Sequence, residues 1–377
     1  MLKELEAKLS EDLTYESGRI LGSMCTKPHS FAAQVYRKYI DKNLGDPGLF
    51  PATKQIEQET IQMLGTLLGN PHVAGYIVTG GTEANILAIW AARNISKTKQ
   101  GEFIVPASAH HSFDKAADLL GCKIIRLQSN GAFQVNPSAM KEAISSRTFA
   151  IVGVAGTTEL GIVDPINELA EIAEQYNLHL HVDAAFGGFV IPFLEKGVKE
   201  NLQFDFHLSG VSSITMDPHK MGMCPIPAGG ILFRNQQMAS AISTNFTYLC
   251  GGETVHQTIV GTRSGAASLA TWAMLKHLGR LGYRKTVNRC MKLTQQLVAG
   301  IEEIKGLEVV TPPTMNVVGI RSDIIDIKVL AKQIRAMKWA VALFPKHIRI
   351  VVMPHVKAAH INNFLEDLKQ ITKRFSS

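Results

Sequence analysis

Short apolar runs alternate with helix-length amphipathic segments across residues 75–234, and this alternation constrains the fold more than any other feature of the chain. Runs such as GYIV (75–78) and FAIVGV (149–154) are separated by stretches such as EANILAIWAARNISK (83–97) and INELAEIAEQYN (166–177). Strands that alternate with helices of this length form βαβ units, which build a mostly parallel sheet covered by helices on both faces. Ligands of such sheets bind in loops at the carboxyl ends of the strands.

The pattern changes after residue 265, where a long helical stretch, interrupted at 279–282, is followed by short strands and helices up to residue 375. This region predicts a small α+β domain. Residues 22–53 are rich in Pro and Gly but also apolar, so we expect an irregular segment that needs another surface to pack on. The chain is therefore divided into an N-terminal arm (1–52), a large domain (53–283) and a small C-terminal domain (284–377).

Composition excludes several classes of protein. The 377 residues carry a net charge of +7, but the 39 Lys and Arg are scattered without a dense block, so we expect no nucleic-acid partner. No apolar run reaches the length of a membrane span, and residues 1–10 lack the apolar core of a signal peptide, so a cytoplasmic location is expected. The five dispersed cysteines contain no C-x-x-C pair, which argues against a disulfide framework and a zinc site, and no metal site is expected.

The stretch VTGGTEANILA (78–88) places a glycine turn between a strand and a helix. Free N–H groups at a helix N-terminus favour an anion, so Gly80, Gly81 and Thr82 could hold a phosphate. A plain glycine turn with Thr82 as the helix cap is the alternative. The spacing matches neither G-x-G-x-x-G nor the P-loop, which disfavours a dinucleotide or a nucleoside triphosphate.

Two charged residues follow apolar strands. Asp183 ends the strand in LHLHVDAAFGG (178–188), and Lys220 follows the run in ITMDPHKMGMCP (214–225). Asp183 could be a magnesium ligand or a structural salt bridge, but the small residues after it would let a flat ligand lie close to the backbone. His110, in SAHHSFDKA (108–116), could stack on such a ligand. A phosphate cradle, a buried acid and a partly dehydrated lysine are the parts that hold pyridoxal 5′-phosphate (PLP).

Five motifs occur in the order TGGTEAN, AHHSFDKA, GTTELGIVDPI, HVDAAFGG and SITMDPHKMG. Together they resemble the group II PLP-dependent amino acid decarboxylases of fold type I. GSMCTKPHSFA, NLGDPGLFPAT, GTRSGA and IRIVVMPH are similar to the archaeal L-tyrosine/L-aspartate decarboxylase branch. The resemblance covers residues 20–368. It implies a mostly parallel seven-stranded sheet with helices on both faces, an N-terminal arm, a small C-terminal α+β domain and a homodimer with its sites at the interface.

The resemblance also implies roles for individual residues. Lys220 would form the Schiff base with PLP, and Asp183 would pair with the pyridine nitrogen. His110 would stack on one face of the ring and Ala185 on the other, with Thr157 near the ring. The residues expected around the phosphate are Gly81, Thr82, Ser213 and His219. Several relatives have Asn where this chain has Asp217, and since an acid beside a phosphate is unfavourable, Asp217 is left outside that shell.

Three further residues are expected to act on the substrate. Tyr248 lies in TNFTYLCGGETVHQT (244–258), a Gly-rich loop that in relatives crosses the dimer interface and supplies the proton to Cα; core packing is the alternative. Arg349 and Arg263 compete as ligands of the substrate carboxylate, because a guanidinium fork matches that anion, and either could be a surface cation.

The expected activity is PLP-dependent α-decarboxylation of a small L-amino acid. The resemblance implies L-tyrosine as substrate, giving tyramine for methanofuran biosynthesis, with L-aspartate, giving β-alanine for coenzyme A biosynthesis, as the second possibility. Another fold-type I lyase or an aminotransferase is the alternative, because these share the fold and the lysine. The alternative outside enzymes is a ligand- or RNA-binding protein on the same scaffold.

Overall fold

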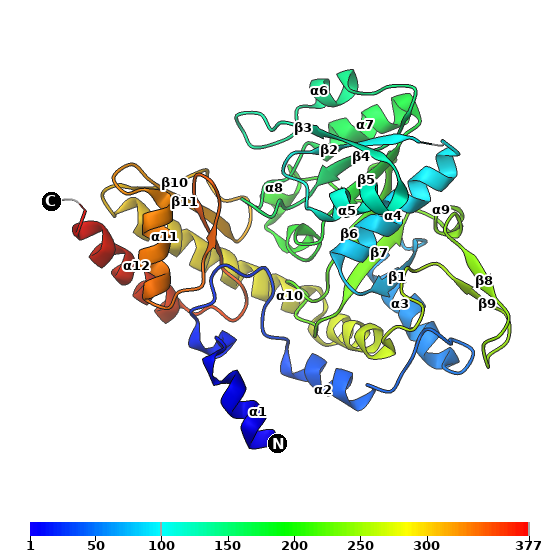
Figure 1. Ribbon diagram of the computed structural model, residues 1–377, viewed down its shortest axis with the longest axis horizontal. Helices are drawn as coiled ribbons and strands as arrows, with labels where there is room; N and C mark the ends of the chain where they lie inside the picture. Colours follow the sequence, from blue (N-terminus) through cyan, green and yellow to red (C-terminus); the bar gives the residue numbers. More distant parts are fainter. Residues whose placement is uncertain (99, 376–377) are drawn as a thin grey trace. The chain divides into compact units, whose positions relative to one another are not determined.

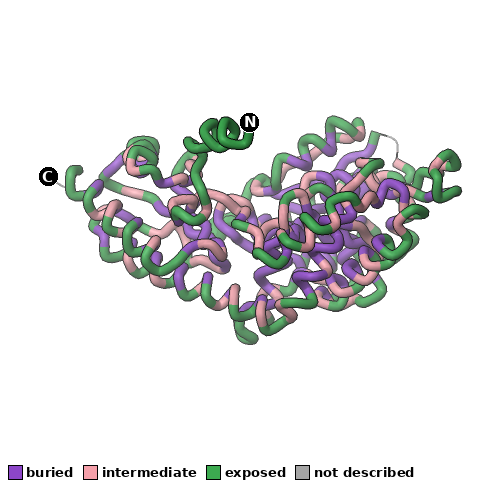
Figure 2. The backbone as a smooth tube through the Cα atoms, turned by 90° about the horizontal axis from the view of Figure 1, so that it is seen from below, coloured by how far each residue is buried: buried purple, intermediate pink, exposed green. Residues whose placement is uncertain are grey.

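The computed structural model describes residues 1–98 and 100–375, and it divides into two compact units. The large unit is Pro28–Asn288, and the small unit combines Met1–Lys27 with Arg289–Ser377. The expected divisions at residues 52/53 and 283/284 stay predictions. Buried residues are concentrated in the central strands of the large unit and in a separate core of the small unit (Figure 2).

A seven-stranded sheet in the order β1-β7-β6-β5-β4-β2-β3 forms the centre of the large unit (Figure 1). Strands β6, β5, β4, β2 and β3 are parallel, and β7 is antiparallel to both of its neighbours, β1 and β6. The mostly parallel seven-stranded sheet expected from the sequence is thereby confirmed. Its strands are β1 (Ala74–Val78), β2 (Glu102–Pro106), β3 (Lys123–Leu127), β4 (Thr148–Val154), β5 (His179–Asp183), β6 (Val211–Met216) and β7 (Gly229–Phe233).

Helices cover both faces of the sheet, which is why β4 is a continuous apolar run with every residue buried. On one face, Val152 packs in a cluster with residues of α4 (Gly81–Ser96) and α5 (Ser112–Leu120). On the other face, a Cβ added to Gly153 would lie 2.4 Å from Ile166 of α7 (Ile166–Tyr176). Because side chains alternate along a strand, residues 152 and 153 face these two opposite layers.

The other helices of the large unit include one that the sequence did not indicate. Helix α2 lies inside the segment expected to be irregular, and Leu44 of that segment is buried against its own unit, where its N–H donates to the carbonyl of Arg263. Gly279 has φ 54° and interrupts α10, as the sequence predicted. The helices are α2 (Ser30–Lys38), α3 (Pro51–Leu67), α6 (Pro137–Glu142), α8 (Lys196–Lys199), α9 (Gln236–Ser240) and α10 (Gly265–Glu302), whose last residues belong to the small unit.

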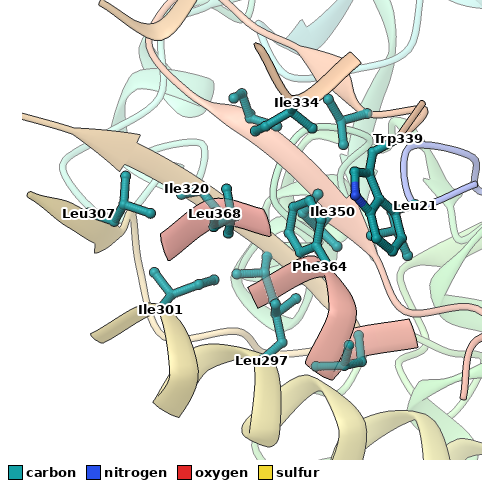
Figure 3. Packing of buried hydrophobic residues seen from close by; sticks show 14 of the residues in the cluster. Leu21, Leu297, Ile301, Leu307, Ile320, Ile334, Trp339, Ile350, Phe364 and Leu368 are labelled. Carbon is teal, nitrogen blue, oxygen red and sulfur yellow. The ribbon is translucent and has the colours of Figure 1, made fainter. Parts of the chain in front are cut away.

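The small unit has a four-stranded antiparallel sheet in the order β10-β11-β13-β12. Leu21, Ile350 and Phe364 meet in its core (Figure 3), and the backbone at Leu21 hydrogen-bonds to Ala340 and Val351. The expected small α+β domain is confirmed, with residues from both ends of the chain. Its elements are α1 (Leu2–Lys8), β10 (Leu307–Val309), β11 (Val317–Ser322), α11 (Ile327–Ala336), β12 (Ala342–Leu343), β13 (Ile348–Val351) and α12 (Ala358–Lys373).

None of the helices in residues 1–98 and 100–375 has both the length and the apolar character needed to cross a bilayer. Over the same residues, no group of three or more His, Cys, Asp or Glu side chains is arranged to hold a metal ion.

Candidate active site

Five loops of the large unit leave the sheet at the same edge (Figure 1). Each follows the carboxyl end of a strand, and each carries residues singled out from the sequence. Gly81 and Thr82 begin α4 after the loop that follows β1, and His110 and Thr157 lie in the loops after β2 and β4. Asp183 is the last residue of β5 and Ala185 follows it, and His219 and Lys220 lie in the turn after β6. The topology therefore gathers motifs that are spread over 140 residues of sequence.

Lys220 is paired with Asp217 in the turn after β6. Its Nζ lies 3.2 Å from Oδ2 of Asp217, whose side chain is only 2% exposed. The same oxygen lies 3.6 Å from Nε2 of His219, and His219 Nδ1 accepts the backbone N–H of Ala228. Asp217 was set aside by the sequence argument, but the structure places its carboxylate directly beside the lysine.

The N-terminus of α4 lies against this turn. A Cβ added to Gly81 would lie 2.9 Å from Oδ2 of Asp217 and 3.3 Å from the Cβ of Ala185, so only glycine allows this close approach. A Cβ on the preceding Gly80 would lie 3.3 Å from the ring of His219. The expected phosphate cradle is thus adjacent to both the aspartate loop and the lysine loop.

Asp183 is held by hydrogen bonds to both of its carboxylate oxygens. Oδ1 accepts the backbone N–H of Ala185 at 3.1 Å, and Oδ2 accepts Nδ2 of Asn85 at 2.9 Å. Buried carboxylates need such donors, because burial without partners is costly. Asn85 belongs to α4, and no local pattern indicates its contact with Asp183, which lies 98 positions further along the chain.

His110 lies at the same place, with its Nδ1 accepting the backbone N–H of Ser112 at 3.2 Å. Partial burial lowers the pKa of His110, while Asp183 opposes this shift and Lys220 adds to it. Charges can shift a pKa in this way only over a short range, so His110, Asp183 and Lys220 share one electrostatic environment. The ring is neutral near pH 7 and presents a flat surface suited to stacking.

Ser213 was expected near the phosphate, and this role stays a prediction that the contacts of its hydroxyl do not favour. Its side chain is fully buried in β6, and its Oγ lies 2.8 Å from both His179 Nε2 and His181 Nδ1 of β5. The hydroxyl is therefore engaged within the sheet layer. Because side chains alternate along a strand, Thr215 lies on the same face of β6 as Ser213, and its Oγ1 donates to Asn85 Oδ1 at 2.7 Å.

Thr157 lies just beyond the carboxyl end of β4. Its Oγ1 accepts the N–H of Ile162 at 3.0 Å, and its side chain is buried. Asp164 ties the same hairpin to the sheet by accepting the N–H groups of Val154 and Val135. The hydroxyl of Thr157 thus stabilises its own loop, and a role beside the ring stays a prediction.

Arg263 does not have a guanidinium fork available for a substrate. Nη1 and Nη2 bind the two carboxylate oxygens of Glu57, the second at 2.6 Å, and Nη1 also donates to the carbonyl of Ile77 at 3.1 Å. Such bidentate pairs use the fork that would bind another carboxylate. This geometry places Arg263 in a buried ion pair, and its expected role as a ligand of the substrate carboxylate stays a prediction that the pair does not favour. The pair lines a cavity of about 660 Å³, most of whose other lining residues come from α3, from β1 and from residues 236–261.

Tyr248 and Arg349 are not brought to Lys220 by the large unit. Tyr248 lies at the tip of a hairpin formed by β8 (Thr244–Phe246) and β9 (Thr254–His256), where the sequence indicated only a loop, and it is 78% exposed. Arg349 lies on β13 of the small unit, where its Nη2 donates to the carbonyl of Gly22 at 2.5 Å. The roles expected for both residues stay predictions.

The similarity of this chain to known proteins covers the same motifs. Residues 21–322 match the pyridoxal-dependent decarboxylase conserved domain, which covers every loop described above. The chain belongs to this family. It is a PLP-dependent carboxy-lyase, as the sequence motifs predicted.

Curated relatives match along nearly the whole chain. The L-aspartate decarboxylase of Thermococcus kodakarensis is 50% identical over 99% of this chain and 97% of the relative. The L-aspartate/L-glutamate decarboxylase of Pyrococcus horikoshii is 48% identical over 98% and 96%. A probable L-tyrosine/L-aspartate decarboxylase of Methanothermobacter thermautotrophicus is 49% identical over 96% and 99%. These relatives confirm the expected archaeal branch.

Solved structures agree with the fold. A sphingosine-1-phosphate lyase from Burkholderia pseudomallei is 28% identical, with a TM-score of 0.90 over 99% of this chain and 90% of that one. A glutamate decarboxylase from Lactobacillus brevis is 22% identical, with a TM-score of 0.89 over 99% and 92%. The expected fold type I of PLP enzymes is confirmed.

The side chains of the site fit PLP. Asp183 offers a fixed carboxylate for the pyridine nitrogen, Lys220 offers an amine for the aldehyde, and the absent side chain of Gly81 opens the N-terminus of α4. Asp217 beside that helix end would repel a phosphate, but the ammonium of Lys220 lies 3.2 Å from its carboxylate and offsets its charge.

Proposed function

We propose that this enzyme removes the α-carboxylate of L-aspartate and releases β-alanine. The observation that carries the proposal is the nearly full-length similarity to relatives named for aspartate, combined with the Lys220, Asp183 and His110 cluster. L-Tyrosine, the substrate first expected from the sequence, is the second candidate, because the Methanothermobacter relative is named for tyrosine as well as aspartate.

PLP, when bound, accepts the electron pair that the departing carboxylate leaves at Cα. The residues of this chain supply the remaining functions. Lys220 would hold the cofactor through its Nζ, and Asp183 would hold the pyridine nitrogen. His110 orients the ring by stacking. Arg349 is proposed to bind a substrate carboxylate, and Tyr248 or the released Lys220 to donate a proton to Cα. Gly81, Thr82 and His219 are proposed to position the phosphate.

The substrate is tested by measuring kcat/KM for carbon dioxide release from L-aspartate, L-tyrosine and L-glutamate under one set of conditions. We expect aspartate to exceed the other two by at least about tenfold, a difference of roughly 1.4 kcal/mol in transition-state binding. L-Aspartate labelled with ¹³C at C4 should keep its label in β-alanine, which distinguishes loss of the α-carboxylate from loss of the β-carboxylate. A higher kcat/KM for L-tyrosine, with tyramine as product, would show that L-tyrosine and not L-aspartate is the substrate.

We also propose that the enzyme is a homodimer in which Tyr248 serves the site of the partner subunit. Tyr248 is 78% exposed at the tip of a short hairpin, and Val255 on the same hairpin is 52% exposed, so the hairpin offers apolar surface that its own unit does not cover. A two-fold symmetric contact would cover both hairpins at once.

Mixing a Lys220→Ala protein with a Tyr248→Phe protein tests this arrangement. Each variant alone should have little activity. After subunit exchange, one site of each hybrid receives both intact residues, so about a quarter of all sites should recover. Recovery should follow the fraction of hybrid dimers measured by native mass spectrometry. Hybrids without recovered activity would show that Tyr248 does not act on the partner subunit.

A further inference from the structure

A chain of buried polar side chains lies behind Asp183, and the functions described above do not use it. His181 of β5, Ser213 of β6 and Asn85 of α4 are each 1% exposed or less, and His179 of β5 is 7% exposed. Four hydrogen bonds connect these side chains into a path that ends at Asp183. They are His179 Nε2 to Ser213 Oγ at 2.8 Å, Ser213 Oγ to His181 Nδ1 at 2.8 Å, His181 Nε2 to Asn85 Oδ1 at 3.0 Å and Asn85 Nδ2 to Asp183 Oδ2 at 2.9 Å.

The direction of every hydrogen bond in this path follows from the carboxylate of Asp183, at which the path ends. A carboxylate only accepts, so Asn85 must direct its Nδ2 to Asp183 and its Oδ1 away. Since Oδ1 also only accepts, the proton of His181 must be on Nε2. Burial lowers the pKa of His181 to about 4, with Asp183 opposing the shift, so the ring is neutral and its Nδ1 is an acceptor.

The directions of the bonds at the His179 end of the path follow in the same way. Because Nδ1 of His181 accepts, the hydroxyl of Ser213 donates to it and must accept from Nε2–H of His179. Burial lowers the pKa of His179 to about 3, so this ring is neutral too. All four bonds therefore donate in one direction, toward Asp183. Hydrogen bonds aligned in this way polarise one another and strengthen the last bond of the series.

Asn85 is fully satisfied, which fixes its amide in place. Its Oδ1 also accepts Thr215 Oγ1 at 2.7 Å, and its Nδ2 also donates to Ser112 Oγ at 2.9 Å, so both acceptor sites and both donors are used. The backbone N–H of Ser112 in turn donates to His110 Nδ1. One amide thus sets the positions of Asp183 and of the loop that carries His110.

We propose that Asn85 and His181 are positioning residues of the decarboxylation reaction, which hold the Asp183 carboxylate toward the pyridine nitrogen through this one-directional series of donors. The proposal rests on the proposed role of Asp183. It assigns no contact with substrate or cofactor to either residue, and both act through Asp183.

Substitutions of His181 separate the donor series from simple packing. His181→Gln keeps a donor for Asn85 and an acceptor for Ser213, whereas His181→Phe keeps the ring volume and loses both. We expect His181→Phe and Asn85→Ala to lower kcat by on the order of ten- to a hundredfold, with KM nearly unchanged, and to weaken PLP binding by a similar factor. His181→Gln should recover most of both losses.

Matched controls and a second readout complete this test. Asn94→Ala on the exposed end of α4 and His72→Gln, also exposed, should behave as wild type in kcat, PLP affinity and thermal midpoint. PLP affinity is measured by titrating the unloaded protein, and the thermal midpoint of each unloaded variant is measured alongside. If His181→Phe lowers the midpoint but keeps wild-type kcat and PLP affinity, the role is structural and the proposal is wrong.

The hydrogen-bond direction is tested without any substitution. In the full chain with ¹⁵N-labelled histidine, both before and after PLP loading, long-range ¹H–¹⁵N spectra should show the Nε2–H tautomer for His179 and His181. A proton on Nδ1 of His181, or a protonated ring at pH 7, would overturn the proposal even if the variants fail to fold. If substitution of Asp183 leaves turnover unchanged, the proposed function is wrong, whereas the tautomers of His179 and His181 would still be those described here.

Discussion

Replacing Lys220 with Arg is expected to reduce turnover by at least about a thousandfold and to abolish covalent capture of PLP by borohydride, while the protein keeps its stability. A guanidinium stays protonated and cannot attack an aldehyde, but it can still pair with Asp217, which lies 3.2 Å from Nζ of Lys220. The measurements are kcat, borohydride-dependent labelling found by peptide mass spectrometry, and the thermal midpoint.

Lys220→Ala is the comparison that separates chemistry from electrostatics. It should be as inactive as Lys220→Arg, but it removes the ammonium that lies 3.2 Å from the buried Asp217 carboxylate, so it should also lose up to about 3 kcal/mol of stability in the unloaded protein. Turnover above a tenth of the wild-type rate in either variant would remove Lys220 from the mechanism. Equal thermal midpoints in the two variants would show that the Asp217 ion pair contributes nothing to folding.

Asp183→Asn is expected to weaken PLP binding and, with PLP at saturating concentration, to slow turnover by about a hundredfold or more. A neutral amide cannot stabilise a protonated pyridine nitrogen, and losing one preorganised charge of this kind typically costs 10²–10³ in kcat. The Asn would also have to turn its NH₂ away from Asn85, because Nδ2 of Asn85 already donates toward position 183.

The measurement combines kcat with bound PLP, which is quantified after release in alkali. Asp183→Glu is the matched control, because it keeps the charge but moves it by one methylene. Its kcat should lie between those of Asp183→Asn and the wild type. A near-normal rate in Asp183→Asn, with PLP fully bound, would show that the pyridine nitrogen does not need this partner.

The parallel sheet and the order of the site loops could be predicted because each depends on local patterns. GYIV and HVDAA are apolar runs that are followed within two residues by glycines, which mark the end of a strand. A parallel sheet brings such strand ends together. The hairpin β8–β9 was missed because strands of three residues show too little alternation to distinguish them from a loop. Helix α2 was missed because flanking Pro and Gly residues obscured its short period.

The contacts that reassigned individual residues are long-range and carry no local signal. Arg263 and Glu57 are separated by 206 positions, and a lone arginine after a loop gives no indication of a buried partner. Asn85 resembles an ordinary polar residue in a helix until the sheet places Asp183 beside it. Ser213 lies in the lysine motif by sequence, yet its side chain points into the sheet layer because of the strand's two-residue period.

The antiparallel insertion of β7 between β1 and β6 also determines when the site can assemble. Strand β1 lies at the edge of the sheet and pairs only with β7, and a Cβ at Gly229 would lie 2.4 Å from Gly80. During synthesis the glycine turn leaves the ribosome long before residue 229, so it cannot take its final place until the later strand arrives. Contacts between distant positions slow folding, because a long loop must close first. The turn that holds Lys220 also waits for this strand, because the N–H of His219 donates to the carbonyl of Ala228. We therefore expect these two turns to become ordered after strands β2 to β5 have associated.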